Sequence, residues 1–318
     1  YLREKGFEVY MFEGPGQGGV MRVQGMHFTH EWEKPVKAVL DYFRLDDVTI
    51  IGISLGGYLA PRAAAFDKRI KRVVAWSVFP CFQDVIVGMQ KPAVQKLFRI
   101  FMALHARPLI NLVFGIKAKK EPVIDWGLKH GMYAYEAKDA YGYAKKLKLY
   151  DIAPIADRIT QDMLIVGANQ DHFIDYRMVG REINMLKNVK SLTFRLFTDK
   201  EDAQNHCNVG NGKLVLDNIC SWIVFFLVRV AVIHKKLAHT VICNGIFGSL
   251  LAHRPVTQRN KLTLPVLAYL YFRGNWSHVL KSAAVPVYNT VELIIEIALT
   301  VKLINTLFKL NGLCDIIF

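Results

Sequence analysis

Cysteine is scarce in this chain, and its spacing excludes two of its common uses. The 318 residues hold five cysteines, an odd number without a Cys-x-x-Cys pair. A disulfide framework uses an even set, and a structural zinc site uses closely paired thiolates. We therefore expect no disulfide framework, no metal and a reducing, cytoplasmic location, since no secretory leader is recognisable at the first residues. The cysteines are Cys81, Cys207, Cys220, Cys243 and Cys314.

Acidic residues are also few, but the resulting positive charge does not indicate a particular class of partner. Lys and Arg number 41 against 27 Asp and Glu, which gives a net charge of +14. The sequence has no arginine-rich run and no nucleic-acid-binding signature, so a solvated basic surface is expected and nucleic-acid binding is not. The glycine-rich loop at residues 14–19 lacks both the GxGxxG spacing and the Walker lysine, so no cofactor is predicted.

Apolar residues, by contrast, are plentiful at 52% and occur in short continuous runs. Runs of this kind, separated by helical patterns, indicate an α/β fold with a mostly parallel sheet that helices cover on both faces. The predicted helices span residues 31–43 and 58–65. The predicted strands span residues 7–12, 48–53, 72–79, 161–168 and 191–197.

The strand rhythm stops between residues 81 and 157. This stretch holds only helix-like segments, at 96–104, 126–135 and 137–147, and predicts a helical cap inserted into a core formed by residues 1–80 and 158–220. Aromatic side chains of the cap are expected mainly in its interior, with a few lining a pocket. They are Trp126, Tyr133, Tyr135, Tyr141 and Tyr143.

Residues 221–318 form an apolar segment that breaks the alternation. A closing helix is expected to begin near Val209 and run past residue 220. Beyond it, residues 230–318 are predicted to add no catalytic residue and no continuation of the sheet. A segment this apolar is expected to pack on the edge of the sheet where strands are missing, to contact a membrane or a partner protein, or to aggregate, and a homodimer is an open alternative.

The strongest local signal is Gly-Ile-Ser-Leu-Gly-Gly at residues 52–57. It follows a buried strand and precedes a helix, which is the context of a nucleophile elbow with Ser54 at its tip. Gly52 and Gly56, with Gly57 beside them, are expected to permit close backbone approach. The backbone N–H of Leu55 is the predicted oxyanion donor.

A serine hydroxyl needs a base, and two later loops supply candidates. Asp171 follows one predicted strand and His206 follows the next, in the chain order nucleophile, acid, histidine. His206 is predicted to accept and return the proton of the serine hydroxyl. Asp171 is predicted to orient the His206 ring. Asp175 and Asp84 are lesser candidates for the acid. Cys81, His172 and Cys207 are expected to be structural, with Cys81 a weak alternative nucleophile.

Together these motifs resemble the α/β-hydrolase family, specifically the capped esterase-like group that includes 2,6-dihydroxypseudooxynicotine hydrolase. The resemblance covers residues 1–222. It implies a sheet between helical layers, a helical cap, and cofactor-independent hydrolysis of an ester, amide or activated carbon–carbon bond. The segments that carry it are residues 13–19, 52–57, 167–174 and 201–211.

The resemblance also implies a second oxyanion donor, on a loop upstream of the strand at residues 7–12. Residues 1–6 look like the tail of the helix that would follow that loop, so the family's first strands are expected to be missing. The triad motifs favour the first of two functions, and the missing oxyanion loop favours the second as its alternative. The first is a serine hydrolase for a small hydrophobic or aromatic substrate, and the second is a non-catalytic protein of the same fold that binds a ligand or partner.

Overall fold

A computed structural model describes residues 1–228 and 315–317. Residues 1–224 and the last six residues group into one compact unit. The second unit, residues 225–312, lies almost entirely outside the described residues. The predictions made for residues 229–314 also fall outside them.

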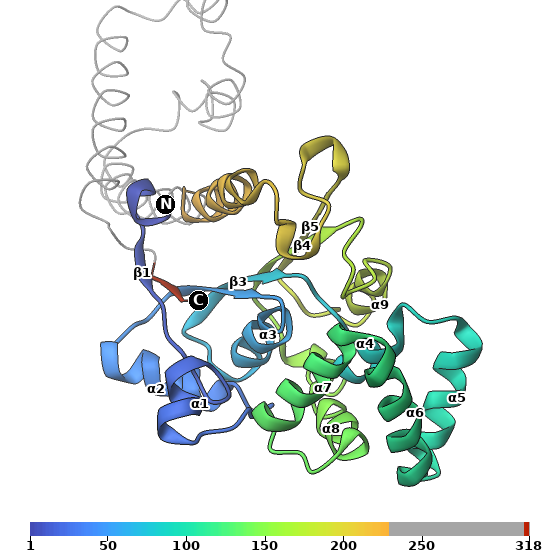
Figure 1. Cartoon of the computed structure of the whole chain (residues 1–318). Helices are drawn as coiled ribbons and strands as arrows, with labels where there is room; N and C mark the ends of the chain where they lie inside the picture. Colours follow the sequence, from blue (N-terminus) through green and yellow to red (C-terminus); the bar gives the residue numbers. More distant parts are fainter. Residues whose placement is uncertain (229–314, 318) are drawn as a thin grey trace, which may run out of the picture. The chain divides into compact units, whose positions relative to one another are not determined.

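The centre of the first unit is a parallel sheet (Figure 1). Its strand order among the described residues is β1-β6-β2-β3-β4-β5, and every neighbouring pair is parallel. This confirms the predicted fold class. The strands are β1 (Glu8–Tyr10), β2 (Val48–Ile53), β3 (Ile70–Trp76), β4 (Asp162–Ala168), β5 (Ser191–Phe197) and β6 (Asp315–Ile317).

Burial explains why the central strands are continuous apolar runs. Every residue of β4 is buried, and only the last residue of β2 is exposed, because helices cover both faces of the sheet. α3 (Gly56–Phe66) lies on one face, and residues 212–224 of the last helix lie on the other (Figure 1). The remaining flanking helices are α1 (Gly18–Gln24), α2 (Glu33–Phe43) and α9 (Met178–Ile183).

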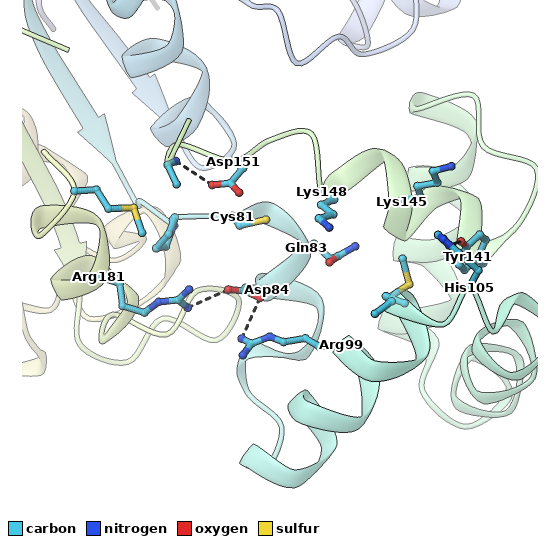
Figure 2. A pocket seen from close by; sticks show the side chains of 15 residues that line it. Cys81, Gln83, Asp84, Arg99, His105, Tyr141, Lys145, Lys148, Asp151 and Arg181 are labelled. Atoms are coloured by element: carbon cyan, nitrogen blue, oxygen red, sulfur yellow. Dashed lines mark hydrogen bonds and ion pairs between the residues drawn. The ribbon is translucent and has the colours of Figure 1, made fainter. Parts of the chain in front are cut away.

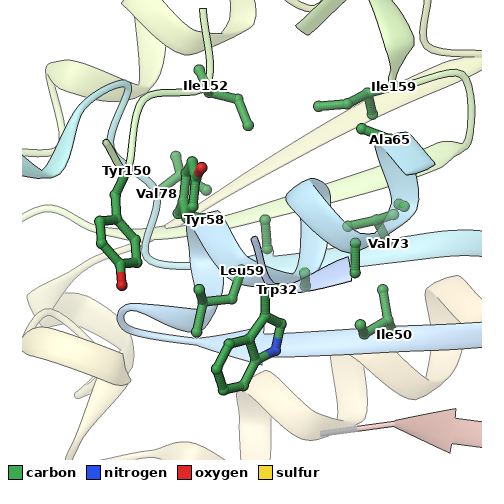
Figure 3. Close-up of a cluster of buried hydrophobic side chains, with 14 of the residues drawn as sticks. Trp32, Ile50, Tyr58, Leu59, Ala65, Val73, Val78, Tyr150, Ile152 and Ile159 are labelled. Carbon is green, nitrogen blue, oxygen red and sulfur yellow. The ribbon is translucent and has the colours of Figure 1, made fainter. Parts of the chain in front are cut away.

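The main core lies between the sheet and the α3 layer. Ile50 of β2 and Val73 of β3 pack with Tyr58 of α3, and all three are almost fully buried (Figure 3). Trp32 and Tyr150 close this cluster from the loops around it. Burying side chains of this size contributes roughly 1.5–3 kcal/mol each, so the cluster fixes the layer from which the nucleophile turn rises.

Helices fill the chain between β3 and β4, as the sequence predicts. Within residues 81–157 the structure has an isolated bridge between Cys81 and Asp151 and no strand of the sheet. The boundaries of a separate cap stay a prediction. α4 and α6 were not predicted, because neither shows a clear apolar stripe. The helices are α4 (Phe82–Gly88), α5 (Pro92–Ala103), α6 (Arg107–Lys120), α7 (Pro122–Ala134) and α8 (Ala140–Leu147).

The end of the chain corrects one prediction. Residues 230–318 were expected to form no conventional continuation of the sheet, with packing on its edge as one alternative, but β6 lies inside the sheet, between β1 and β2. Ile316 is in register with Val9 on one side and with Thr49 on the other. β1 and β2 are not neighbours, so each would expose unpaired backbone groups toward the other without β6. Although β6 has only three residues, it provides hydrogen-bond partners for the backbones of both β1 and β2.

Among the described residues, no single helix has the length and apolar character needed to cross a membrane. One pair of helical segments, Asp199–Asn208 and Gly212–Val228, meets the criterion only when joined across a bend of 83°.

The placement of β6 predicts the effect of Ile316→Pro. Proline removes a backbone N–H and would leave a carbonyl of a neighbouring strand unpaired, which costs about 1–3 kcal/mol. Urea denaturation should show this loss of stability. Hydrogen exchange should be faster than in the unchanged chain at whichever of the Thr49 and Ile50 amides faces β6, since successive amides of β2 point alternately toward β6 and β3. Unaltered exchange at both amides would mean that β6 does not pair with β2.

Candidate active site

Ser54 occupies a tight turn between β2 and α3. Its φ of 58° lies in the left-handed region, which is strained for a residue with a side chain. Two backbone bonds hold the turn. The Ser54 N–H donates to the Trp76 carbonyl (2.8 Å), and the Ser54 carbonyl accepts from the Gly57 N–H (2.8 Å). The strand–turn–helix geometry is that of a nucleophile elbow.

Two glycines make this turn possible. A Cβ on Gly52 would lie 2.0 Å from the Gly56 carbonyl oxygen, and a Cβ on Gly57 would lie 2.1 Å from the Ser77 carbonyl oxygen. Gly56 was also predicted to permit close approach, and that part is wrong, because a Cβ there would meet nothing within 4 Å. The close contacts are therefore at Gly52 and Gly57, not at Gly56.

Asp171 lies on the loop that follows β4. Its Oδ1 accepts hydrogen bonds from the backbone N–H groups of Phe173 (2.8 Å) and Ile174 (2.9 Å). Its Oδ2 lies 2.7 Å from His206 Nδ1. The Asp171 side chain is only 3% exposed. The carboxylate is therefore buried, oriented by its own loop, and directed at the imidazole.

His206 completes the arrangement from the loop that follows β5. It begins the short helix His206–Asn208, and its Nε2 lies 2.9 Å from Ser54 Oγ. The Gln170 N–H donates to the Gln204 carbonyl (3.0 Å), so the acid loop and the histidine loop are joined by their backbones as well. The structure thus brings the three predicted side chains into one chain of hydrogen bonds.

The electrostatics of the pair favour a charged Asp171. Burial lowers the pKa of His206, but the hydrogen bonds to Asp171 and Cys207 outweigh it and raise that pKa to about 9. Burial raises the pKa of Asp171, but hydrogen bonds from His206 and from the backbones of Ile174 and Phe173 outweigh it, and the pKa is lowered. At neutral pH the imidazole is therefore held largely protonated against a carboxylate.

The backbone N–H of Leu55 lies at the start of a helix, as expected for an oxyanion donor. Leu55 caps the N-terminus of α3, directly after Ser54. Among the described residues its backbone N–H has no hydrogen-bond acceptor. A free N–H at the positive end of a helix can bind a developing negative charge.

The lesser candidates have other partners. Asp84 accepts from Arg99 (3.1 Å) and Arg181 (3.0 Å), and Asp175 pairs with Arg177. Asp84 and Cys81 line a separate cavity of about 620 Å³ among α4, α5, α8 and α9, and no triad residue lines it (Figure 2). Burial raises the pKa of the Cys81 thiol, which makes it a poorer nucleophile.

Apolar and aromatic side chains stand beside the serine. The Phe173 ring lies 5.0 Å from the His206 ring and is 43% exposed, and Ile53, which directly precedes Ser54, is 40% exposed. Neither was singled out from the sequence, although Phe173 follows the acid by two residues. Among the predicted cap aromatics, Tyr135 is buried, whereas Trp126 and Tyr133 are mostly exposed.

No group of His, Cys, Asp or Glu side chains in residues 1–228 or 315–317 has the arrangement of a metal site. The glycine loop at residues 14–19 packs closely against aromatic rings. Gly14 lies against the ring of Trp32 and Gly16 against that of Phe28. The recognisable chemistry of the described residues at this edge of the sheet is that of the serine, the histidine and the carboxylate.

Comparison with known proteins agrees with this geometry. The profile of the alpha/beta hydrolase fold matches residues 1–195, which is more than half of the chain. The chain therefore belongs to the alpha/beta hydrolase family. Its curated relatives carry hydrolase names, which supports a hydrolase of this type.

The similar proteins are fungal and longer. Hydrolyase poxO of Penicillium oxalicum is 38% identical over 187 residues, 54% of this chain and 44% of that protein. Alpha/beta hydrolase psoB of Aspergillus fumigatus is 33% identical over 147 residues, 42% of this chain and 32% of that protein. The chain thus spans less than half the length of these relatives. A solved 2,6-dihydroxy-pseudo-oxynicotine hydrolase is 17% identical with a TM-score of 0.46, over 66% of this chain and 50% of that one.

The packing of the elbow predicts different effects on stability for alanine substitutions at Gly52 and at Gly56. Gly52→Ala places a Cβ against the Gly56 carbonyl and should lower the free energy of unfolding by about 1–3 kcal/mol. Gly56→Ala, the matched control, adds a methyl group in open space at a helix start and should leave stability nearly unchanged. Urea denaturation measures both. Equal losses would show that the turn is not packed as described.

The charge arrangement predicts the effect of Asp171→Asn. The amide keeps the shape of the side chain but removes the charge that raises the pKa of His206. The pKa should fall clearly below about 9, because burial lowers it and only the contacts with Cys207 then oppose burial. NMR titration of ¹⁵N-labelled histidine measures it, with the His206 signal identified from His206→Gln. A pKa that stays near 9 would assign the shift to another group.

Proposed function

We propose that this chain is a cofactor-independent serine hydrolase in which Ser54, His206 and Asp171 act as a catalytic triad. The observation that carries the proposal is the unbroken hydrogen-bond chain from Ser54 Oγ through His206 to Asp171, with distances of 2.9 and 2.7 Å. Membership of the hydrolase family supports it, and so does the elbow geometry of Ser54. No other arrangement among the described residues offers a serine with a base and an oriented acid.

The geometry supports a two-step acyl transfer. Ser54 Oγ attacks the carbonyl carbon of the substrate while its proton passes to His206 Nε2. The Leu55 N–H stabilises the negative charge that develops on the carbonyl oxygen. The leaving group takes the proton from His206 as its bond to carbon breaks. Water then repeats the sequence, giving the free acid and restoring the Ser54 hydroxyl.

Asp171 has two effects in this scheme. It holds the Nδ1 proton of His206, so that Nε2 of the neutral ring faces the serine. It also stabilises the imidazolium that forms when the ring accepts the proton. Because a protonated ring cannot act as the base, the rate of attack should rise with pH as His206 loses its proton.

The surroundings of the serine favour a small hydrophobic or aromatic substrate. Ile53 and Phe173 leave apolar surface open beside the nucleophile and the histidine. One relative, 40% identical over 81 residues, is named 20-hydroxy-prefusarin hydrolase of Gibberella moniliformis, but the match covers only 19% of that protein. The family resemblance implies an ester, an amide or an activated carbon–carbon bond, and the apolar surface favours such a bond next to an apolar group.

A fluorophosphonate probe tests the proposal, since it reacts covalently only with an activated serine. We expect the folded chain to be labelled, with peptide mapping placing the adduct on Ser54. Ser54→Ala should abolish labelling, while Ser77→Ala, a change at a serine outside the triad, should retain it.

Labelling that persists in Ser54→Ala would contradict the assignment of the nucleophile. A folded chain that is not labelled at all would favour the alternative, a non-catalytic protein of the same fold that binds a ligand or partner.

A further inference from the structure

Trp76, the last residue of β3, contacts both halves of the site. Its carbonyl accepts the Ser54 N–H (2.8 Å), and its indole N–H donates to Asn208 Oδ1 (2.7 Å). The residue is 4% exposed. One buried residue therefore joins the turn of the nucleophile, through its backbone carbonyl, to the loop of the histidine, through its indole, and the second bond links residues 132 positions apart.

Asn208 follows His206 by two residues, is fully buried, and uses both ends of its amide. Its Oδ1 accepts from Trp76, and its Nδ2 donates to the Ala203 carbonyl (2.5 Å). Its backbone N–H donates to Asn205 (2.8 Å). Breaking either side-chain bond would leave a buried polar group without a partner, so these bonds define the position of the loop strongly.

The backbone after His206 is strained. Cys207 has a φ of 52° and Asn208 a φ of 53°, both in the left-handed region. Asparagine tolerates this region better than most residues, but cysteine does not. Strain of this kind persists only where the surroundings impose it. The buried bonds of Asn208 to Trp76 and Ala203 supply such a constraint.

We propose that Trp76 and Asn208 are positioning residues, a clamp that holds the His206 ring between Ser54 Oγ and Asp171 Oδ2. Neither touches the reacting atoms. Their catalytic consequence rests on the proposed function, whereas their effect on the His206–Asp171 contact does not.

Two substitutions open the clamp in different ways. Asn208→Gly removes the side chain but permits the left-handed backbone, so it separates the clamp from the strain. Trp76→Phe keeps an aromatic ring and removes the N–H donor. Trp222→Phe is the matched control, because the indole of Trp222 also donates a hydrogen bond, to Thr193 Oγ1 (3.2 Å), away from the triad.

Fluorophosphonate labelling and NMR titration give two independent readouts. Both clamp variants should label about 10- to 100-fold more slowly than the unchanged chain, with the noncovalent affinity for the probe retained, because misplaced reacting groups cost rate rather than binding. The pKa of His206 should fall from about 9 toward 6.5, since the contact with Asp171 loosens. Trp222→Phe should keep both the rate and the pKa.

A purely structural role would give a different pattern. If the clamp variants lose thermal stability to the same extent as Trp222→Phe but keep the labelling rate and the His206 pKa, the proposal is wrong. If the unchanged chain is not labelled, the proposed function fails, and the titration still decides on the clamp. Should Asn208→Gly not fold, Trp76→Phe provides both readouts.

Discussion

The hydrogen bond between His206 Nδ1 and Asp171 Oδ2 is the interaction on which the site depends. It keeps the carboxylate charged inside the protein, raises the pKa of the imidazole, and turns Nε2 of that ring toward Ser54. A buried carboxylate without such partners would be neutral rather than charged. The two backbone N–H groups that bind Asp171 Oδ1 complete its compensation and fix its direction.

The sheet brings these loops together because its strands are parallel. All catalytic candidates follow the carboxyl ends of strands, where open α/β sheets place their sites. Backbone hydrogen bonds continue past the strand ends, so the first residue of each loop has a fixed position relative to the neighbouring strand. These bonds run from Ser54 to Trp76, from Ser77 to Val166 and from Asn169 to Phe197.

Local signals in the sequence were sufficient to predict several strands and the three candidate catalytic residues. β2 and β5 have the predicted bounds, because each is a continuous apolar or alternating run with clear ends. Ser54, Asp171 and His206 could be chosen because each follows a strand in the family's order. Gly57 and Gly52 could be recognised as glycines of a turn, but which contact each one permits depends on Ser77 and on the helix start.

What could not be predicted depends on contacts between distant residues. β6 has only three residues, and nothing in its own sequence indicates that it lies between two strands from the beginning of the chain. The Trp76–Asn208 bond is equally invisible, since a tryptophan at a strand end and an asparagine in a loop are both common. The left-handed backbone of Cys207 has no local sequence signal either.

The most direct test of the account is whether the reactivity of Ser54 follows the protonation of His206. The rate of fluorophosphonate labelling should be measured from pH 6 to pH 10.5 and compared with the NMR titration of His206 in the same chain. The account predicts that the rate rises with pH and that both curves share one midpoint, near the pKa of about 9. A labelling rate that is already maximal at pH 7, while His206 remains protonated, would contradict the proposed roles of these two residues.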